Sequence, residues 1–255
     1  MIRCPVCQAS LYESNGSYRC SNHHCFDVAK QGYVNLLLNQ TGSGDNIVMV
    51  KARQLVMSSG QFIPLQTCLS DLVASLEPTS ILDAGCGEGY FTRQFIIATN
   101  NVVGIDISKH AISHAAKLDP HHLYIVASNY HLPLFDKSVD CLINIMAPHS
   151  EEEFSRVSAR YIIKVVPNRL HLLEIKQALY DEVILHDAKE VNFPGFQLKK
   201  QTTLQYQTLC SDVATLIQMT PYCYTTFDLL SKIPDAPMMT TFDFVLYIYE
   251  REAKI

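Results

Sequence analysis

The sequence of 255 residues has no apolar run close to the roughly 18 residues that a helix needs to span a bilayer. It has no basic start followed by an apolar stretch, so we expect a cytoplasmic protein with no secretory leader and no membrane contact. Internal repeats and low-complexity tracts are also missing, which argues against a repeat architecture. With 48% hydrophobic residues, the chain has the composition of a globular protein.

Positive charge is scarce as well. The formal net charge is −5, so charge alone does not indicate a nucleic-acid partner. The distribution is uneven, because residues 1–60 carry a net charge of +2 and the remainder carries −7. The N-terminal end is therefore the part better suited to contact a phosphate-rich partner, although its basic residues also fit an ordinary solvated surface. These residues are Arg3, Arg19, Lys30, Lys51 and Arg53.

Three glycines at alternate positions follow a short apolar stretch in residues 81–90, whose sequence is ILDAGCGEGY. The pattern predicts a strand that ends at a glycine turn and leads into a helix over residues 91–98, so that a ligand can lie against bare backbone. A second predicted strand, residues 102–106, ends at Asp106, the position that binds ribose hydroxyls in folds of this kind. Together the two strands predict a cofactor site, and the alternative is a tight turn that binds nothing.

The spacing of the glycines distinguishes two classes of cofactor. Dinucleotide sites use G-x-G-x-x-G, whereas this chain has D-x-G-x-G-x-G, with Asp83 before the glycines and Glu88 among them. Carboxylates would repel a diphosphate but attract S-adenosylmethionine, which carries a sulfonium and an ammonium group and no phosphate. The segment resembles the first motif of class I methyltransferases. Its predicted cofactor residues are Asp83, Gly85, Gly87, Glu88, Gly89 and Asp106.

The order of elements downstream fits the same class. Residues 124–128 and 141–146 are predicted strands, and LPLFDKSVD lies between them at 132–140. The alternation predicts an α/β class I methyltransferase fold, Rossmann-like, with a mostly parallel twisted sheet and helices on both faces. In such enzymes the loop after the third strand lies beside the adenine, and the alternative is an ordinary strand end. The resemblance therefore implies three more cofactor residues, Ala127, Ser128 and Asn129.

Two groups of metal-binding residue types lie near the N-terminus. Cys4 and Cys7 form the first, Cys20 begins the second, and SNGS at 14–17 predicts a hairpin between them. In a reducing compartment this spacing favours tetrahedral zinc, with disulfides or inert buried thiols as the alternatives. The spacing leaves the fourth ligand open among His23, His24 and Cys25.

The sequence CSNHHCFDVAKQGYVNLL at 20–37, joined to Cys-Pro-x-Cys upstream and the glycine motif downstream, resembles the 23S rRNA (guanine-N1)-methyltransferase family, RlmA. Almost the whole chain falls under this resemblance. It implies that His23 lies on the surface, that Cys25 is not a ligand and that the protein is a homodimer. The implied zinc ligands are Cys4, Cys7, Cys20 and His24.

The length and the resemblance divide the chain into two expected units. Residues 1–40 form a zinc-binding RNA-recognition module, and residues 41–255 form the S-adenosylmethionine-dependent methyltransferase domain, with residues 40–45 as the clearest linker. Two positions outside the glycine motif are implied cofactor residues, Phe62 and His171. Family members can have tyrosine in place of Phe62, so a hydroxyl contact is lost while an apolar contact is kept. Without the resemblance, His171 would be better explained as a polar residue on a helix surface, and the resemblance makes the two interpretations equal.

Two segments depart from the pattern of related enzymes. Many methyltransferases have a K-P-G-G turn before the fifth strand, whereas residues 156–163 contain neither proline nor glycine, so the turn must be built differently. Residues 147–149, APH, stand where many amino-methylating enzymes have N-P-P-Y, which makes methylation of an exocyclic amine less favoured.

The implied reaction is methylation of ring nitrogen 1 of a guanine in a 23S ribosomal RNA hairpin. That nitrogen is protonated at neutral pH, so a positioned base would assist the transfer. The candidates near the end of the fourth strand are Asn144, His149 and Glu153, while Cys86 and Cys141 are predicted to be packing thiols. Two other functions stay open. One is methylation of a small molecule such as a quinone, and the other is RNA binding without catalysis on a methyltransferase fold.

Overall fold

The computed structural model describes residues 2–38, 47–220 and 236–253, so the whole of the expected linker at 40–45 lies outside the described residues. The N-terminal module contains a three-stranded antiparallel sheet of β1 (Tyr12–Ser14), β2 (Ser17–Arg19) and β3 (Cys25–Asp27). Asn15 and Gly16 turn the β1–β2 hairpin with φ values of 52° and 74°. Both residue types favour this left-handed backbone, which explains the predicted hairpin.

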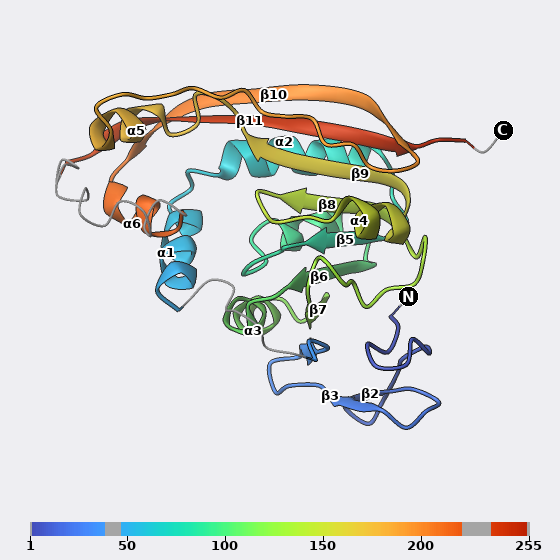
Figure 1. Cartoon of the computed structure of the whole chain (residues 1–255). Helices are drawn as coiled ribbons and strands as arrows, with labels where there is room; N and C mark the ends of the chain where they lie inside the picture. Colours follow the sequence, from blue (N-terminus) through green and yellow to red (C-terminus); the bar gives the residue numbers. More distant parts are fainter. Residues whose placement is uncertain (1, 39–46, 221–235, 254–255) are drawn as a thin grey trace.

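A second sheet of eight strands forms the body of the protein in the order β10-β11-β9-β8-β5-β6-β7-β4 (Figure 1). The strands from β4 to β9 run parallel, and β11 runs antiparallel to both of its neighbours. The predicted fold class is therefore confirmed. Their bounds are β4 Val34–Asn35, β5 Ile81–Ala84, β6 Val102–Asp106, β7 Leu123–Val126, β8 Val139–Ile145, β9 Ser158–Pro167, β10 Phe196–Cys210 and β11 Met238–Arg251.

Helices cover both faces of this sheet. Successive side chains of its central strands point to opposite faces, and each face has an apolar core. Ile81 and Cys141 belong to the core under α1, α2, η1, α5 and α6, whereas Leu82 and Leu142 belong to the core shared with α4 and the N-terminal module. In Figure 1, α1 and α6 lie side by side at the left of the sheet. The helices are α1 Ile47–Ser58, α2 Ile63–Ser75, η1 Thr92–Ile97, α3 Lys109–Leu118, α4 Glu151–Val157, α5 Leu173–Leu179 and α6 Val213–Gln218.

Three local features differ from the sequence-based expectation. The helix expected after the glycine turn is only the short 3-10 helix η1, in a segment that includes β-branched Thr92, Ile96 and Ile97. Strand β7 ends at Val126, two residues before the predicted end. The unusual segment before the fifth strand contains no turn at all, because β9 begins at the residue after the last residue of α4.

The N-terminal module is joined to the sheet by backbone hydrogen bonds. Strand β4 pairs in parallel with β7 at the sheet edge, although it falls within the predicted 1–40 module. The Arg3 amide donates to Pro133 O at 3.0 Å, and Ile2 bridges to Leu134. The module thus packs directly against the loop after β7 and lies at the bottom of Figure 1. Among the described residues, no helix is long and apolar enough to cross a membrane.

Candidate functional site

The sulfur and nitrogen atoms of four N-terminal side chains converge on one point. The ligand atoms of Cys4, Cys7, Cys20 and His24 all lie within 4.8 Å of one another. Cys20 Sγ is 3.4 Å from His24 Nδ1, and Cys7 Sγ is 3.7 Å from Cys20 Sγ. Tetrahedral zinc, with bonds of about 2.3 Å to sulfur and about 2.0 Å to nitrogen, separates its ligand atoms by about 3.5–3.8 Å. The donor set therefore fits zinc.

The fold also separates the three candidates for the fourth ligand. His24 is half-buried with its ring beside the cysteines, whereas His23 and Cys25 are exposed. His23 occupies a left-handed turn position with φ 63°, and Cys25 Sγ lies 3.9 Å from Asp27. The geometry selects His24, in agreement with the resemblance.

We expect the His24→Ala protein to lose its zinc and the adjacent His23→Ala protein to keep it. A structural zinc site needs all four ligands, and removing one opens the coordination shell to water. Metal content per chain, measured on the purified variants, tests the assignment. Retained zinc in His24→Ala together with lost zinc in His23→Ala would reverse it.

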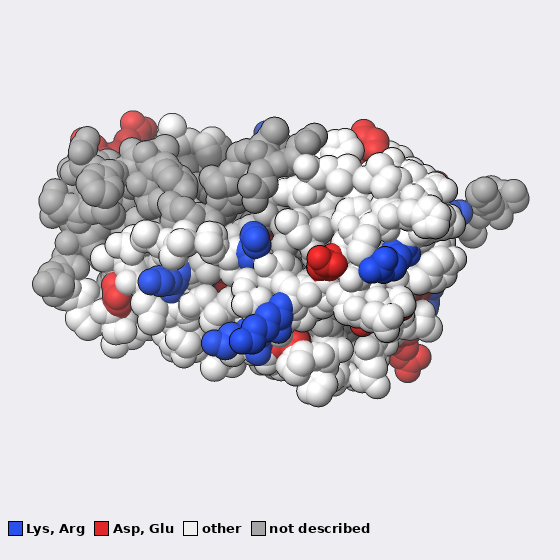
Figure 2. All heavy atoms as spheres, turned by 90° about the horizontal axis from the view of Figure 1, so that it is seen from below, with Lys and Arg blue, Asp and Glu red and all other residues white. Residues whose placement is uncertain are grey.

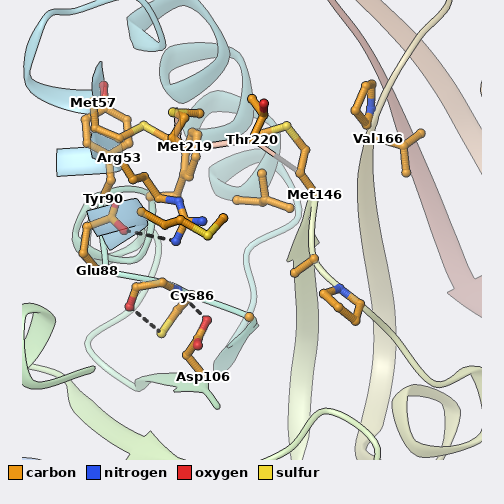
Figure 3. Close-up of a pocket in the computed structure, with 18 of the residues that line it drawn as sticks. Arg53, Met57, Cys86, Glu88, Tyr90, Asp106, Met146, Val166, Met219 and Thr220 are labelled. Atoms are coloured by element: carbon orange, nitrogen blue, oxygen red, sulfur yellow. Dashed lines mark hydrogen bonds and ion pairs between the residues drawn. The ribbon is translucent and has the colours of Figure 1, made fainter. Parts of the chain in front are cut away.

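A cavity of about 840 Å³ opens at the carboxyl ends of the central strands. The glycine turn forms one wall, since Gly85 and Gly87 both line the cavity with positive φ values of 85° and 56°. A Cβ at Gly85 would overlap the Cβ of Ala147, so this backbone position admits only glycine. The opposite walls come from α1, α6 and the segment after β8 (Figure 3).

Two buried carboxylates lie beside the glycine turn. Asp83 accepts a hydrogen bond from Thr92 Oγ1 at 2.6 Å through Oδ2, while its Oδ1 has no hydrogen-bond partner among the described residues. Glu88 Oε2 lies 3.7 Å from Arg53 Nη1, an ion pair visible in Figure 3, and lacks a hydrogen bond there. Burial raises the pKa of both carboxyl groups to about 7. Unsatisfied buried carboxylate oxygens suit a cationic ligand, so the turn fits S-adenosylmethionine.

Asp106 ends β6 at the cavity wall, as the ribose prediction requires. Its Oδ2 accepts from the Gly87 amide at 2.9 Å, and its Oδ1 accepts from the Ser108 amide at 2.8 Å. The carboxylate therefore also supports the glycine turn from the neighbouring strand. This structural contact was not anticipated from the sequence.

The remaining predicted cofactor positions divide into two groups. Phe62, Ser128, Asn129 and His171 line the cavity, but Ala127 and Gly89 are not among its lining residues. Gly89 has another reason to be glycine, because a Cβ there would lie 2.9 Å from the Tyr124 hydroxyl oxygen. His171 precedes α5 and does not lie on a helix surface.

Phe62 and His171 are the two ring side chains predicted to contact the cofactor, and Phe62 is buried whereas His171 is half-buried. Phe62 packs edge-on against Phe242, with ring centroids 5.2 Å apart. Burial, followed by the charge of Lys176, lowers the pKa of His171 to about 3, so its imidazole is neutral. The Asp243 amide donates to His171 Nδ1 at 3.3 Å. Both rings are thus fixed by β11.

None of the three predicted catalytic candidates lines the cavity. The Glu153 carboxylate binds Arg156 in a bidentate ion pair at 2.7 and 2.8 Å, which helps to lower its pKa against the effect of burial. His149 lies 3.5 Å from Glu151, and burial lowers the pKa of its imidazole. Asn144 donates to Ala84 O at 2.6 Å. Their catalytic roles stay predictions, since each side chain has a structural partner.

Several lining residues were not predicted from the sequence. Arg53 had been counted only as a surface charge, and Lys164 had not been noticed, although a lysine inside the apolar run of β9 is a visible signal. Cys86 and Cys141 are buried, and burial raises the pKa of both thiols, as expected of packing side chains. No sequence pattern predicted that four methionines line the cavity, and these are Met49, Met57, Met146 and Met219.

Comparison with known proteins agrees with both modules. Residues 2–41 match the zinc-ribbon family model "RlmA, N-terminal", and residues 82–165 match a methyltransferase domain. The 23S rRNA (guanine(748)-N(1))-methyltransferase of Streptomyces fradiae is 34% identical over 188 residues, covering 70% of this chain and 67% of that protein. YxjB of Bacillus subtilis (strain 168), provisionally named a 23S rRNA (guanine-N(1)-)-methyltransferase, is 33% identical over 196 residues, covering 71% and 70%.

A solved structure of a methyltransferase from Anaeromyxobacter dehalogenans, provisionally assigned to type II, has a TM-score of 0.50 and 17% identity to this chain. The superposition covers 71% of this chain and 94% of the solved chain. At this level of identity the similarity supports the fold alone.

The sheet, the glycine turn and the convergent Cys3His cluster define the protein as an S-adenosylmethionine-dependent class I methyltransferase with an N-terminal zinc ribbon. The two rRNA methyltransferase relatives exceed 30% identity over about 70% of the chain. The chain belongs to the 23S rRNA (guanine-N1)-methyltransferase family, RlmA.

Proposed function

We propose that this protein transfers a methyl group from S-adenosylmethionine to ring nitrogen 1 of a guanine in a 23S ribosomal RNA hairpin. The observation that carries the proposal is the combination, in one chain, of the Cys3His ribbon and the acidic glycine-turn cavity. Two relatives that match about 70% of the chain are named as 23S rRNA guanine-N1 methyltransferases, one of them provisionally. Ribosomal RNA as the substrate places the reaction in the cytoplasm, and the homodimer stays a prediction.

The cavity suggests how the cofactor would lie. Asp106 would accept the ribose hydroxyls, Ser128 and Asn129 would lie at the adenine, and the methionine end would lie towards Asp83 and Glu88. Asn129 Oδ1 is buried without a hydrogen-bond partner among the described residues, which leaves an acceptor for an exocyclic amine. S-adenosylmethionine supplies an electrophilic methyl on a sulfonium, and the chain supplies position and charge.

Substrate selection is assigned in this proposal to residues 1–40. Figure 2 shows Lys and Arg side chains scattered over a mostly uncharged face of the molecule. Arg19 and Lys30 are exposed and available to phosphate, whereas half-buried Arg3 donates to Leu132 O at 3.5 Å and lies at the junction with the methyltransferase domain. Arg3 is therefore less suited to RNA binding than its position in the sequence suggested.

Mapping of modified nucleosides tests the reaction. Ribosomal RNA lacking modification is incubated with the pure protein and labelled S-adenosylmethionine, and its fragments are analysed by mass spectrometry. Methyl on nitrogen 1 of one hairpin guanine is the expected result. Label in small-molecule substrates but not in RNA would favour the metabolite methyltransferase, and cofactor binding without any transfer would favour the non-catalytic alternative.

We expect the double variant Arg19→Ala, Lys30→Ala to bind the RNA hairpin more weakly and with less dependence on salt. Each lost phosphate contact reduces the slope of log affinity against log salt by about 0.7–0.9. Filter binding over a range of salt concentrations measures it. The matched control is Lys189→Ala, Lys199→Ala, which removes two exposed charges outside residues 1–40. If the two double variants have the same slope of log affinity against log salt, residues 1–40 do not bind the RNA.

A further inference from the structure

Two lysines line the cavity, Lys164 and Lys176, and only Lys164 is buried. Lys164 lies in β9 between two buried aliphatic residues, and only 3% of it is exposed. Burial of an ammonium group is unfavourable unless partners compensate for the lost water. Lys164 Nζ donates to Asn144 Oδ1 and, at 3.1 Å, to Ala147 O. Both hydrogen-bond partners are neutral, and the charge of Glu151 offsets the effect of burial on the pKa of Lys164 only in part.

The two partners hold Lys164 at a defined place. Asn144 faces Lys164 across the β8–β9 pair and donates in turn to Ala84 O, immediately before the glycine turn. Ala147 is the residue that would collide with a side chain at Gly85. The lysine is thus fixed to the cofactor half of the cavity while it lines the adjoining half with Met146 and Pro167.

An ammonium group has three protons, and two of them are used by Asn144 and Ala147. No third partner is present among the described residues, and Lys164 forms no ion pair there. Burial lowers the pKa of the Lys164 ammonium to about 8, so it is still largely charged at neutral pH. The cavity therefore contains a positioned charged donor with one unused proton.

The proposed reaction requires such a donor. Ring nitrogen 1 of guanine loses its proton to water, and the electron pair left behind is shared between nitrogen 1 and the oxygen at carbon 6. The nitrogen pair then forms the new bond to the methyl carbon, and the carbon–sulfur bond breaks with its electrons on sulfur. Negative charge on the oxygen is absent from neutral guanine, forms when nitrogen 1 loses its proton, and is lost again as the methyl bond forms. A preorganised cation beside the oxygen therefore stabilises the anion and the transition state that follows it more than the neutral bound guanine.

We propose that Lys164 is a catalytic residue whose free N–H donates to the carbonyl oxygen at carbon 6 of the target guanine and stabilises the charge formed when nitrogen 1 loses its proton. This inference rests on the proposed function. It explains why a lysine occupies a strand position that otherwise carries apolar side chains. It also explains why no general base has to line the cavity, because the cation makes nitrogen 1 more acidic.

The test compares Lys164→Met and Lys164→Gln with the control Lys199→Met. Lys199 is half-exposed on β10 and pairs with Glu250 at 2.7 Å, so the control removes the same charge outside the cavity. We expect Lys164→Met to lower kcat on the RNA hairpin by about 10²-fold, the usual effect of losing one such donor. The Gln variant, a neutral donor, should fall between it and the wild type. Cofactor affinity, measured by calorimetry, should change less than about twofold, and Lys199→Met should match the wild type.

A second substrate separates catalysis from support of the fold. In a hairpin with 6-thioguanine at the target, nitrogen 1 is more acidic and sulfur is a poor hydrogen-bond acceptor, so the reaction depends less on the lysine. The gap between wild type and Lys164→Met should then shrink to less than about 10-fold. An equal loss with both hairpins, or no loss with guanine, overturns the inference. If the wild type itself places no methyl on nitrogen 1, the proposed function fails, which is a distinguishable result.

Discussion

Replacing Gly85 with alanine should abolish measurable cofactor binding. Gly85 has a φ of 85°, in the left-handed region where a side chain costs about 1–3 kcal/mol. The added Cβ would also overlap the Cβ of Ala147 and approach Asn129 Nδ2 to 3.3 Å. Because both contacts belong to segments that line the cavity, relief of the clash must displace the cavity wall. We expect a loss of affinity for S-adenosylmethionine of more than about 100-fold by calorimetry, which corresponds to about 2.7 kcal/mol.

The matched control is Gly16→Ala. Gly16 has a similar φ of 74° but has no atom within 4 Å of the added Cβ, and it lies in the β1–β2 hairpin outside the cavity. The Gly16→Ala protein should therefore unfold at a lower urea concentration, because alanine is strained at this φ. Its affinity for the cofactor should equal that of the wild type. Equal cofactor affinity in the wild type and a folded Gly85→Ala protein would mean that the cofactor does not contact this turn.

The parts of the fold that followed from the sequence are those fixed by local chemistry. The glycines at 85, 87 and 89 all have positive φ, which glycine adopts with the least strain, so the turn was visible without tertiary information. The metal ligands were visible because zinc restricts both residue type and spacing. The choice of His24 over His23 needed the resemblance, since two adjacent histidines satisfy the same spacing.

The features that escaped prediction depend on contacts between distant segments. Strand β4 has only two residues and is recognisable through its pairing with β7. The direct passage from α4 into β9 is stabilised by Arg156, which donates to Leu132 O and Leu134 O at 3.0 and 2.7 Å. No local pattern specifies such long-range bonds. The same holds for Glu153, whose carboxylate seemed available in the sequence but is bound by Arg156.

The contribution of Asp83 and Glu88 to the stability of the protein without cofactor should fall as the pH rises from about 4 to about 7. Asp83 and Glu88 have pKa values of about 7 in the folded state because both are buried. Their ordinary values are about 3.9 and 4.3, so between these values and 7 the folded state binds more protons than the unfolded state. This contribution then decreases with pH through the window and levels off above it. Urea unfolding of the wild type and of Asp83→Asn at a series of pH values separates it from the opposite contribution of His171, whose pKa is lowered to about 3.

Cofactor binding should show the opposite dependence on pH, because its sulfonium and ammonium groups favour the ionised carboxylates. Below pH 7, binding must expel protons from Asp83 and Glu88, and the affinity should rise by up to about 10-fold per pH unit for each proton released. Calorimetry in two buffers of different ionisation enthalpy counts these protons. Asp83→Asn should release fewer of them, whereas Asp71→Asn, the same change at an exposed site on α2, should behave as the wild type. If the wild type releases no protons at pH 6, these carboxylates do not receive the cationic end of the cofactor.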